Sequence, residues 1–190
     1  MLKIILATTS PYRKETFEYL GIPFEGVGSN VDESQLERNS PEELVKGLSK
    51  LKAEAVAKDR SDSIVIGMDS IGYFNNHIFE KPKSKKEDFE RLKSFSGNTH
   101  YFYTGIHMIN TASGESLSRV VKTEVLMREV SGEEIEKYLS EDERFNTYAL
   151  GYDPVRHYSA SFVKEIKGSY YNLLGGIPLE TIVEMLKEIQ

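Results

Sequence analysis

The chain has 190 residues, of which 39% are apolar and 28% are charged, and its formal net charge is -6 at pH 7. These proportions predict a single globular domain over residues 1–190 and exclude a disordered chain, while the negative charge argues against a nucleic-acid-binding surface. The absence of cysteine excludes disulfide bonds, thiolate zinc sites and cysteine nucleophiles.

Residues 4–15 have the pattern of a buried strand that turns into a helix, with Ser10 as N-cap and Pro11 at the first helical position. Backbone N–H groups, the helix dipole and the Arg13 and Lys14 charges would converge there, which suits a polyphosphate or a carboxylate. The simpler interpretation is a strand-to-helix corner with solvated basic residues. The run at 2–7 is too short for a signal peptide or a membrane span, so we expect a cytoplasmic protein with no membrane partner.

The next predicted elements are a helix ending at Gly21, a short strand over 24–28, and a loop with Asp32 and Glu33. A capping box at residues 40–43 predicts a helix reaching residue 58, with a buried stripe at Leu44, Leu48, Leu51 and Ala55. Lys52 falls inside this apolar face. Its amine must therefore either extend outward to solvent, which the pattern alone favours, or meet an anion.

The continuous apolar run 64–68 predicts a strand covered on both faces that ends at Asp69 and Ser70. Open α/β sheets place ligands at such strand ends, although a carboxylate here could also simply cap a turn. Residues 71–79 predict a hairpin around Asn75 and Asn76, followed by a basic exit over 80–83 and a helix over 84–96.

Alternation over 100–110 and 117–128 predicts two antiparallel strands, the first interrupted at Thr104 and Gly105 by a bulge or by close approach of a ligand. A capping box predicts a helix over 131–139, and residues 141–143 form an acidic loop that we expect to be solvated. Residues 148–158 are too irregular to assign. A strand over 161–166 and a helix starting near Pro178 complete the chain, with apolar residues at 179, 182, 183 and 186.

The polar and charged residues at the ends of the predicted elements include the groups needed to hydrolyse a phosphoanhydride. Cations neutralise phosphates, and carboxylates hold a hard metal ion and accept a proton from water. The chain has neither GxxxxGK[ST] nor GxGxxG, which argues against P-loop and Rossmann sites, and no HExxH, which argues against a zinc enzyme. The candidates are the cations and hydroxyls Ser10, Arg13, Lys14, Lys52 and Lys81 and the carboxylates Glu33 and Asp69.

Six stretches occur in order along the chain: 6–15 (LATTSPYRKE), 31–34 (VDES), 67–70 (GMDS), 81–82 (KP), 96–97 (SG) and 103–105 (YTG). Together with 162–168 and 176–178, they resemble the Maf family of nucleoside triphosphate pyrophosphatases, which is named from an association with inhibition of septum formation. The resemblance implies an α/β fold of two lobes around a central cleft, with a mixed extended sheet flanked by helices, similar to that of inosine triphosphate pyrophosphatases.

The resemblance also implies hydrolysis of a nucleoside triphosphate to monophosphate and pyrophosphate with a divalent metal, Mg²⁺ or Mn²⁺. Asp69 matches the family's proton acceptor and Glu33 a carboxylate near the metal, so both are the expected metal ligands. Lys52 and Lys81 match phosphate-binding positions and join them in the expected catalytic set. The expected substrate-binding residues are Ser10, Tyr12, Arg13, Lys14, Ser70, Thr104, Gly105 and Arg156.

The chain departs from the family pattern where its subgroups distinguish bases. The subgroup acting on dTTP and UTP usually has arginine where this chain has Tyr12, threonine where it has Ser70, and glutamine near the position of Arg156. The subgroup acting on 7-methyl-GTP carries an aromatic residue at this position, as this chain does with Tyr12. An aromatic ring there could stack on a cationic methylated base. That subgroup has glutamate near Arg156, however, so the base stays open between the two types.

An alternative is a nucleotide-binding regulator of cell division that lacks significant turnover. Nucleic acid is not an expected partner, because the cations are scattered among acids. Exposed strands and the last helix would permit a homodimer.

Overall fold

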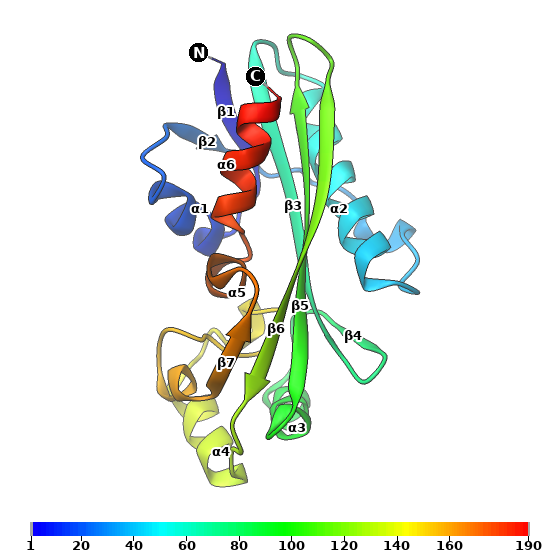
Figure 1. The fold of residues 1–190 in the computed structure, drawn as a ribbon. Coiled ribbons are helices and arrows are strands. Elements are labelled where there is room, and N and C mark those ends of the chain that lie inside the picture. The colour runs from blue at the N-terminus through cyan, green and yellow to red at the C-terminus, as the bar shows by residue number, and fades with distance from the viewer. Residues whose placement is uncertain (1, 190) are drawn as a thin grey trace.

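The computed structural model describes residues 2–189, and over this range the protein has an α/β fold built on one seven-stranded mixed sheet flanked by helices (Figure 1). Short 3₁₀ turns at 33–35, 145–147 and 158–161 complete the structure. No helix within residues 2–189 combines the length and apolar character needed to cross a membrane. The elements are β1 (Lys3–Ala7), α1 (Pro11–Glu18), β2 (Phe24–Gly26), α2 (Pro41–Ala57), β3 (Ser63–Phe74), β4 (His77–Phe79), α3 (Lys85–Phe95), β5 (Thr99–Asn110), β6 (Ser116–Met127), α4 (Gly132–Glu141), β7 (Val163–Lys167), α5 (Tyr170–Gly175) and α6 (Leu179–Glu188).

The strand order is β2-β1-β3-β5-β6-β7, and β4 pairs with β3 at the far end of that strand. The pairs β1–β2 and β1–β3 are parallel, and the pairs β3–β4, β3–β5, β5–β6 and β6–β7 are antiparallel. Pairing of β1 with β3 stops at Ala7 opposite Gly67, whereas β3 continues for seven more residues to Phe74. The edge of β3 beyond Gly67 is therefore not covered by β1.

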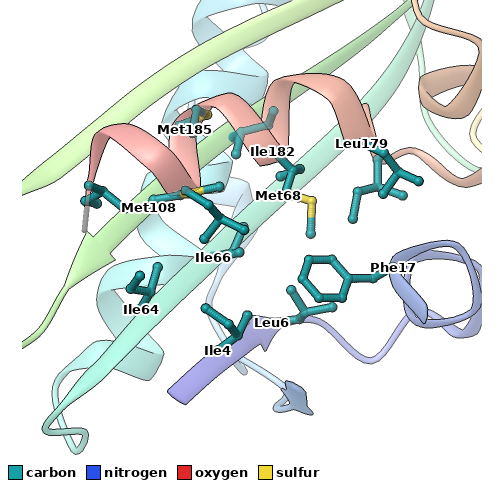
Figure 2. Close-up of a cluster of buried hydrophobic side chains, with 14 residues drawn as sticks. Ile4, Leu6, Phe17, Ile64, Ile66, Met68, Met108, Leu179, Ile182 and Met185 are labelled. Atoms are coloured by element: carbon teal, nitrogen blue, oxygen red, sulfur yellow. The ribbon is translucent and has the colours of Figure 1, made fainter. Parts of the chain in front are cut away.

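The side chains of β3 alternate between two apolar layers, as the two-residue period of a strand requires. Figure 2 shows Ile64, Ile66 and Met68 facing the last helix, α6. Val65 belongs instead to the layer under α2, on the opposite face. The cluster under α6 also contains Ile4, Leu6, Phe17, Met108, Leu179, Ile182 and Met185.

A separate core lies at the other end of the long strands, around α3 and α4 (Figure 1). It is rich in aromatic residues, and Phe95, Tyr138, Tyr152 and Phe162 are fully buried. The sheet thus joins two packed regions, and the unpaired edge of β3 lies between them.

Most of the predicted elements are confirmed within a few residues, but the prediction that the strand ends at Asp69 and Ser70 is wrong. β3 passes through Asp69 and Ser70 without a break, and it is β1 that ends here. The hairpin turn at Asn75 and Asn76 is confirmed, with φ values of 48° and 61°. The reciprocal capping box is present at Ser131, whereas Glu87 accepts from the Lys83 N–H instead of the Ser84 N–H.

Two further predictions need correction, and one helix was missed. β5 is continuous through Thr104 and Gly105, with no bulge. Asp142 is 1% exposed and its carboxylate accepts hydrogen bonds from the Tyr138 hydroxyl and the Arg144 N–H, so it is not solvated, whereas Glu141 and Glu143 are exposed as expected. The short helix α5, which lies just before α6, was not predicted.

The glycine in β5 is explained by the approach of helix α2. A Cβ on Gly105 would lie 2.1 Å from the Val45 carbonyl oxygen, and a Cβ on Gly67 would lie 2.2 Å from that of Ser49. The close approach at Gly105 is therefore made by a helix backbone and not by the ligand that the sequence suggested, and the helix can pack tightly only over these two glycines.

We expect Gly105→Ala to destabilise the fold by about 2 kcal/mol or more, because the α2 backbone must move to admit the methyl group. Gly132→Ala is the matched control, since its Cβ would meet Phe89 at an ordinary 3.5 Å. Chemical denaturation of both variants measures the difference, and equal stability of the two would contradict this explanation.

Asp88 on α3 is fully buried, and both of its carboxyl oxygens have no hydrogen-bond partner among residues 2–189. Burial raises the pKa of Asp88 from 3.8 to about 8, although nearby Arg91 partly opposes this. The unfolded chain loses this proton near its ordinary pKa and the folded chain keeps it to about pH 8. The free energy of unfolding therefore falls as pH rises through that interval.

Asp88→Asn should flatten this dependence, so that stability changes less between pH 6 and pH 8 than in the wild type. Denaturation at the two pH values measures the slope, with the exposed Glu90→Gln on the same helix as control. A wild-type slope in Asp88→Asn would show that Asp88 does not titrate as described.

Candidate active site

A cleft of about 760 Å³ opens beside the part of β3 that β1 leaves unpaired. One wall is the turn between β1 and α1, together with Asp69 and Ser70 of β3. The opposite wall comes from the loop after β4 and the loop after α4, which includes residues 144–154. The turn between α5 and α6, the loop over 28–33 with Glu33, and Lys52 of α2 also line it.

The turn from β1 into α1 is formed as the sequence predicts. Ser10 is the N-cap, and its hydroxyl accepts from the Arg13 N–H at 3.4 Å, while the Ser10 N–H donates to the Thr8 hydroxyl at 3.1 Å. Ser10, Pro11 and Tyr12 line the cleft. The positive end of the α1 dipole is thus directed at the cleft, where it favours an anion.

Arg13 lines the cleft, but its guanidinium also holds the surrounding backbone. It donates to the Met68 and Gly176 carbonyl oxygens at 3.1 Å each and to the Ser70 hydroxyl at 2.8 Å. Desolvation by burial lowers the pKa of Arg13, and the Asp69 and Glu33 carboxylates partly oppose this. Arg13 therefore joins α1, β3 and the α5–α6 turn, and it contributes a fixed positive charge to the cleft.

Lys52 extends from α2 to two carboxylates. Its Nζ lies 2.5 Å from Asp69 Oδ1 and 2.8 Å from Glu33 Oε1. The side chains of Lys52 and Asp69 are each 12% exposed, so the amine meets anions instead of extending to solvent. Burial raises the pKa of Asp69, although the Lys52 and Arg13 charges act in the opposite direction.

Ser70 and Thr104 lie on the opposite face of the sheet from Lys52. Their hydroxyl oxygens are 2.7 Å apart, and the Ser70 hydroxyl also meets Arg13. Ser70 lines the cleft, while Thr104 is fully buried behind it. Gly105 lies against α2, outside the cleft lining, and its backbone allows that helix to bring Lys52 toward Asp69.

The remaining sequence-predicted cations are divided between the cleft and the surface. Lys81 lines the cleft. Lys14 packs across Gly26, where an added Cβ would meet its Cε at 2.5 Å. Arg156 forms an ion pair with Glu15 at 2.9 Å and is 42% exposed. The structure therefore does not bring Lys14 and Arg156 into the cleft lining with the others.

Sequence reasoning missed an aromatic and polar wall in the loop after α4. The Tyr12 hydroxyl is 2.8 Å from the Thr147 hydroxyl, and its ring packs on Tyr148 with centroids 5.2 Å apart. Tyr148 in turn donates to Asp153, which accepts the N–H groups of Val155 and Arg156. The aromatic content of 148–158 was the one available signal, but nothing in it indicated pairing with Tyr12.

Comparison with known proteins places the chain in a family. The family described as "Maf-like protein" matches residues 3–189. The chain is 37% identical over 187 residues to the dTTP/UTP pyrophosphatase of Syntrophus aciditrophicus, covering 98% of this chain and 90% of that protein. It is 38% identical over 188 residues to the dTTP/UTP pyrophosphatase of Bacillus anthracis, covering 99% and 96%. The chain belongs to the Maf family.

In this Maf protein, Glu33 and Asp69 are the carboxylates that could hold a metal ion. No group of three or more His, Cys, Asp or Glu side chains gathers within residues 2–189 in a way that could do so. Two carboxylates fit a hard cation such as Mg²⁺, which commonly completes its coordination with water and substrate phosphates. Both carboxylates contact Lys52, so a bound cation would share them with its amine.

Lys52→Met should destabilise the Maf protein by about 1–3 kcal/mol at pH 7, because the buried Asp69 carboxylate loses its charged partner. Lys50→Met is the matched control on the same helix, since Lys50 pairs with Glu54 at 3.8 Å on the surface. That variant should stay within about 0.5 kcal/mol of wild type. Equal denaturation midpoints for the two variants would show that the Lys52 contacts do not stabilise the fold.

Proposed function

We infer that this Maf protein hydrolyses a nucleoside triphosphate to the monophosphate and pyrophosphate. The observation that carries this inference is the Lys52–Asp69 contact of 2.5 Å inside the cleft, beside the N-terminus of α1. It combines a carboxylate able to accept a proton with a cation able to stabilise developing phosphate charge. The relatives named as dTTP/UTP pyrophosphatases support the same reaction class.

Asp69 is the proton acceptor in the proposed mechanism. A water molecule attacks the α-phosphorus and transfers a proton to Asp69, and the bond from the α-phosphorus to the α–β bridging oxygen breaks, so that pyrophosphate leaves. The raised pKa of Asp69 suits proton acceptance, because a more basic carboxylate takes a proton from water more readily. Lys52 keeps the carboxylate oriented and balances negative charge.

Several groups of the cleft wall bind the phosphates in this proposal. The Ser10 corner presents the positive end of α1, and Arg13 and Lys81 add positive charge. Glu33 and Asp69 would hold Mg²⁺ or Mn²⁺, which, when bound, neutralises phosphate oxygens and polarises the phosphorus centre. The packed regions at the two ends of the sheet form the two lobes around this cleft, an arrangement similar to that of inosine triphosphate pyrophosphatases.

The preferred bases are those of dTTP and UTP. The identity of 37–38% over nearly the whole chain to relatives with that name supports this choice. Tyr12 and Ser70 replace the arginine and threonine typical of that subgroup, and Arg156 lies outside the cleft lining, paired with Glu15. The Tyr12 ring beside Tyr148 offers an aromatic surface for a base instead.

Pyrophosphate release with Mg²⁺ or Mn²⁺ tests this proposal across dTTP, UTP, GTP, 7-methyl-GTP and ITP. We expect turnover of dTTP and UTP, with kcat reduced about 100-fold or more in Asp69→Asn while nucleotide binding is retained. The exposed Asp59→Asn, which removes the same charge, should keep wild-type activity.

Two other outcomes would contradict parts of the proposal. Tight binding without turnover of any nucleotide would exclude the pyrophosphatase and leave a nucleotide-binding regulator. Turnover confined to 7-methyl-GTP would exclude the pyrimidine preference.

A further inference from the structure

Arg144 lines the cleft from the wall opposite the β1–α1 turn, and the proposed reaction does not yet use it. Its side chain is exposed, and it makes no ion pair with any carboxylate within residues 2–189. Lys52, by contrast, is engaged by two carboxylates, and all three types of Arg13 nitrogen donate to protein acceptors. The Arg144 guanidinium is therefore available to an anion in the cleft.

The backbone of Arg144 is fixed from both sides. Its N–H donates to the buried Asp142 carboxylate at 2.8 Å. Its carbonyl oxygen accepts from the Thr147 hydroxyl at 2.7 Å, and that hydroxyl is 2.8 Å from the Tyr12 hydroxyl. The turn that carries Arg144 is thus tied across the cleft to the first turn of α1, next to the Ser10 corner.

The buried Arg91, which is outside the cleft lining, links this wall to two further cations. The Arg91 Nη1 donates to the Glu80 carbonyl oxygen at 2.7 Å and to the Ala149 carbonyl oxygen at 2.9 Å. This joins the segment that carries Lys81 and Lys83, both in the cleft lining, to the loop that follows Arg144. Arg144, Lys81 and Lys83 therefore place three cations in the cleft lining, and none of these three has an ion-pair partner in the described part of the chain.

We propose that Arg144 binds the distal phosphates of the triphosphate, those that leave as pyrophosphate, and that Thr147 positions it. The proposal rests on the proposed pyrophosphatase function. Asp69 and Glu33 mark the reacting phosphorus, whereas Arg144 shares the cleft lining with Lys81 and Lys83, and such a group of cations suits the most negatively charged part of the substrate, its distal phosphates. A guanidinium matches phosphate oxygens with two parallel hydrogen bonds, and Arg13 is not free to make them because its nitrogens already donate to protein acceptors.

Calorimetric binding of α,β-imido-dUTP and of dUMP, both with Mg²⁺, tests the proposal without turnover. Arg144→Ala should weaken binding of the triphosphate analogue about 10-fold to 100-fold and change dUMP binding by less than about twofold. Arg144→Lys should recover part of the loss, because it restores charge without the planar donor pair. Lys164→Ala, which removes an exposed cation outside the cleft lining, should bind both ligands as wild type does.

Thr147→Val tests the positioning role, because it keeps the shape of the side chain but removes the hydroxyl. We expect a loss of a few fold for the analogue alone, and no additional loss in the Arg144→Ala background. Wild-type affinity of Arg144→Ala for the analogue, or equal losses for dUMP and the analogue, would overturn the proposal. Wild-type protein that binds the analogue through Arg144 but hydrolyses no triphosphate would overturn the proposed function alone.

Discussion

The contact of the Lys52 amine with Asp69 and Glu33 is the interaction on which the site depends. It requires helix α2 to lie close to the sheet, and the helix can do so because Gly67 and Gly105 present no Cβ to its backbone. The same packing buries Asp69, which raises its pKa, while the lysine keeps the carboxylate oriented. Tight helix packing and the acid–base character of the cleft therefore have one structural origin.

The second constraint is the unequal length of two neighbouring strands. β1 stops at Ala7, while β3 continues to Phe74 and reaches the second apolar core. The uncovered stretch of β3 carries side chains to both faces, so Asp69 meets α2 while Ser70 meets Arg13. The Arg13 guanidinium then joins β3 to the α5–α6 turn, and the cleft is closed on the far side by the loop after α4.

Local patterns predicted much of this structure, because caps and periodicity depend on neighbours in sequence. The Ser10 corner and the Ser40 and Ser84 caps are formed as expected, and the α6 stripe differs from the prediction only in that Met185 is buried and Val183 is half-buried. What failed depends on distant partners. The polar Asp69 indicates the end of a strand in the sequence, because the sequence does not show that α2 covers this part of β3. Gly105 indicates an interruption, because the sequence does not show that the Val45 backbone packs against it. The pairing of Tyr12 with Thr147 spans 135 residues, so no local signal could indicate it.

The central claim is that the cleft directs water to the α-phosphorus, so that the bond to pyrophosphate breaks. Turnover of dTTP in ¹⁸O-labelled water, followed by mass spectrometry of both products, tests this claim most directly. The account predicts one labelled oxygen in dTMP and none in pyrophosphate. Label in the pyrophosphate, or release of labelled inorganic phosphate with dTDP, would place the attack at the β- or γ-phosphorus and contradict the account.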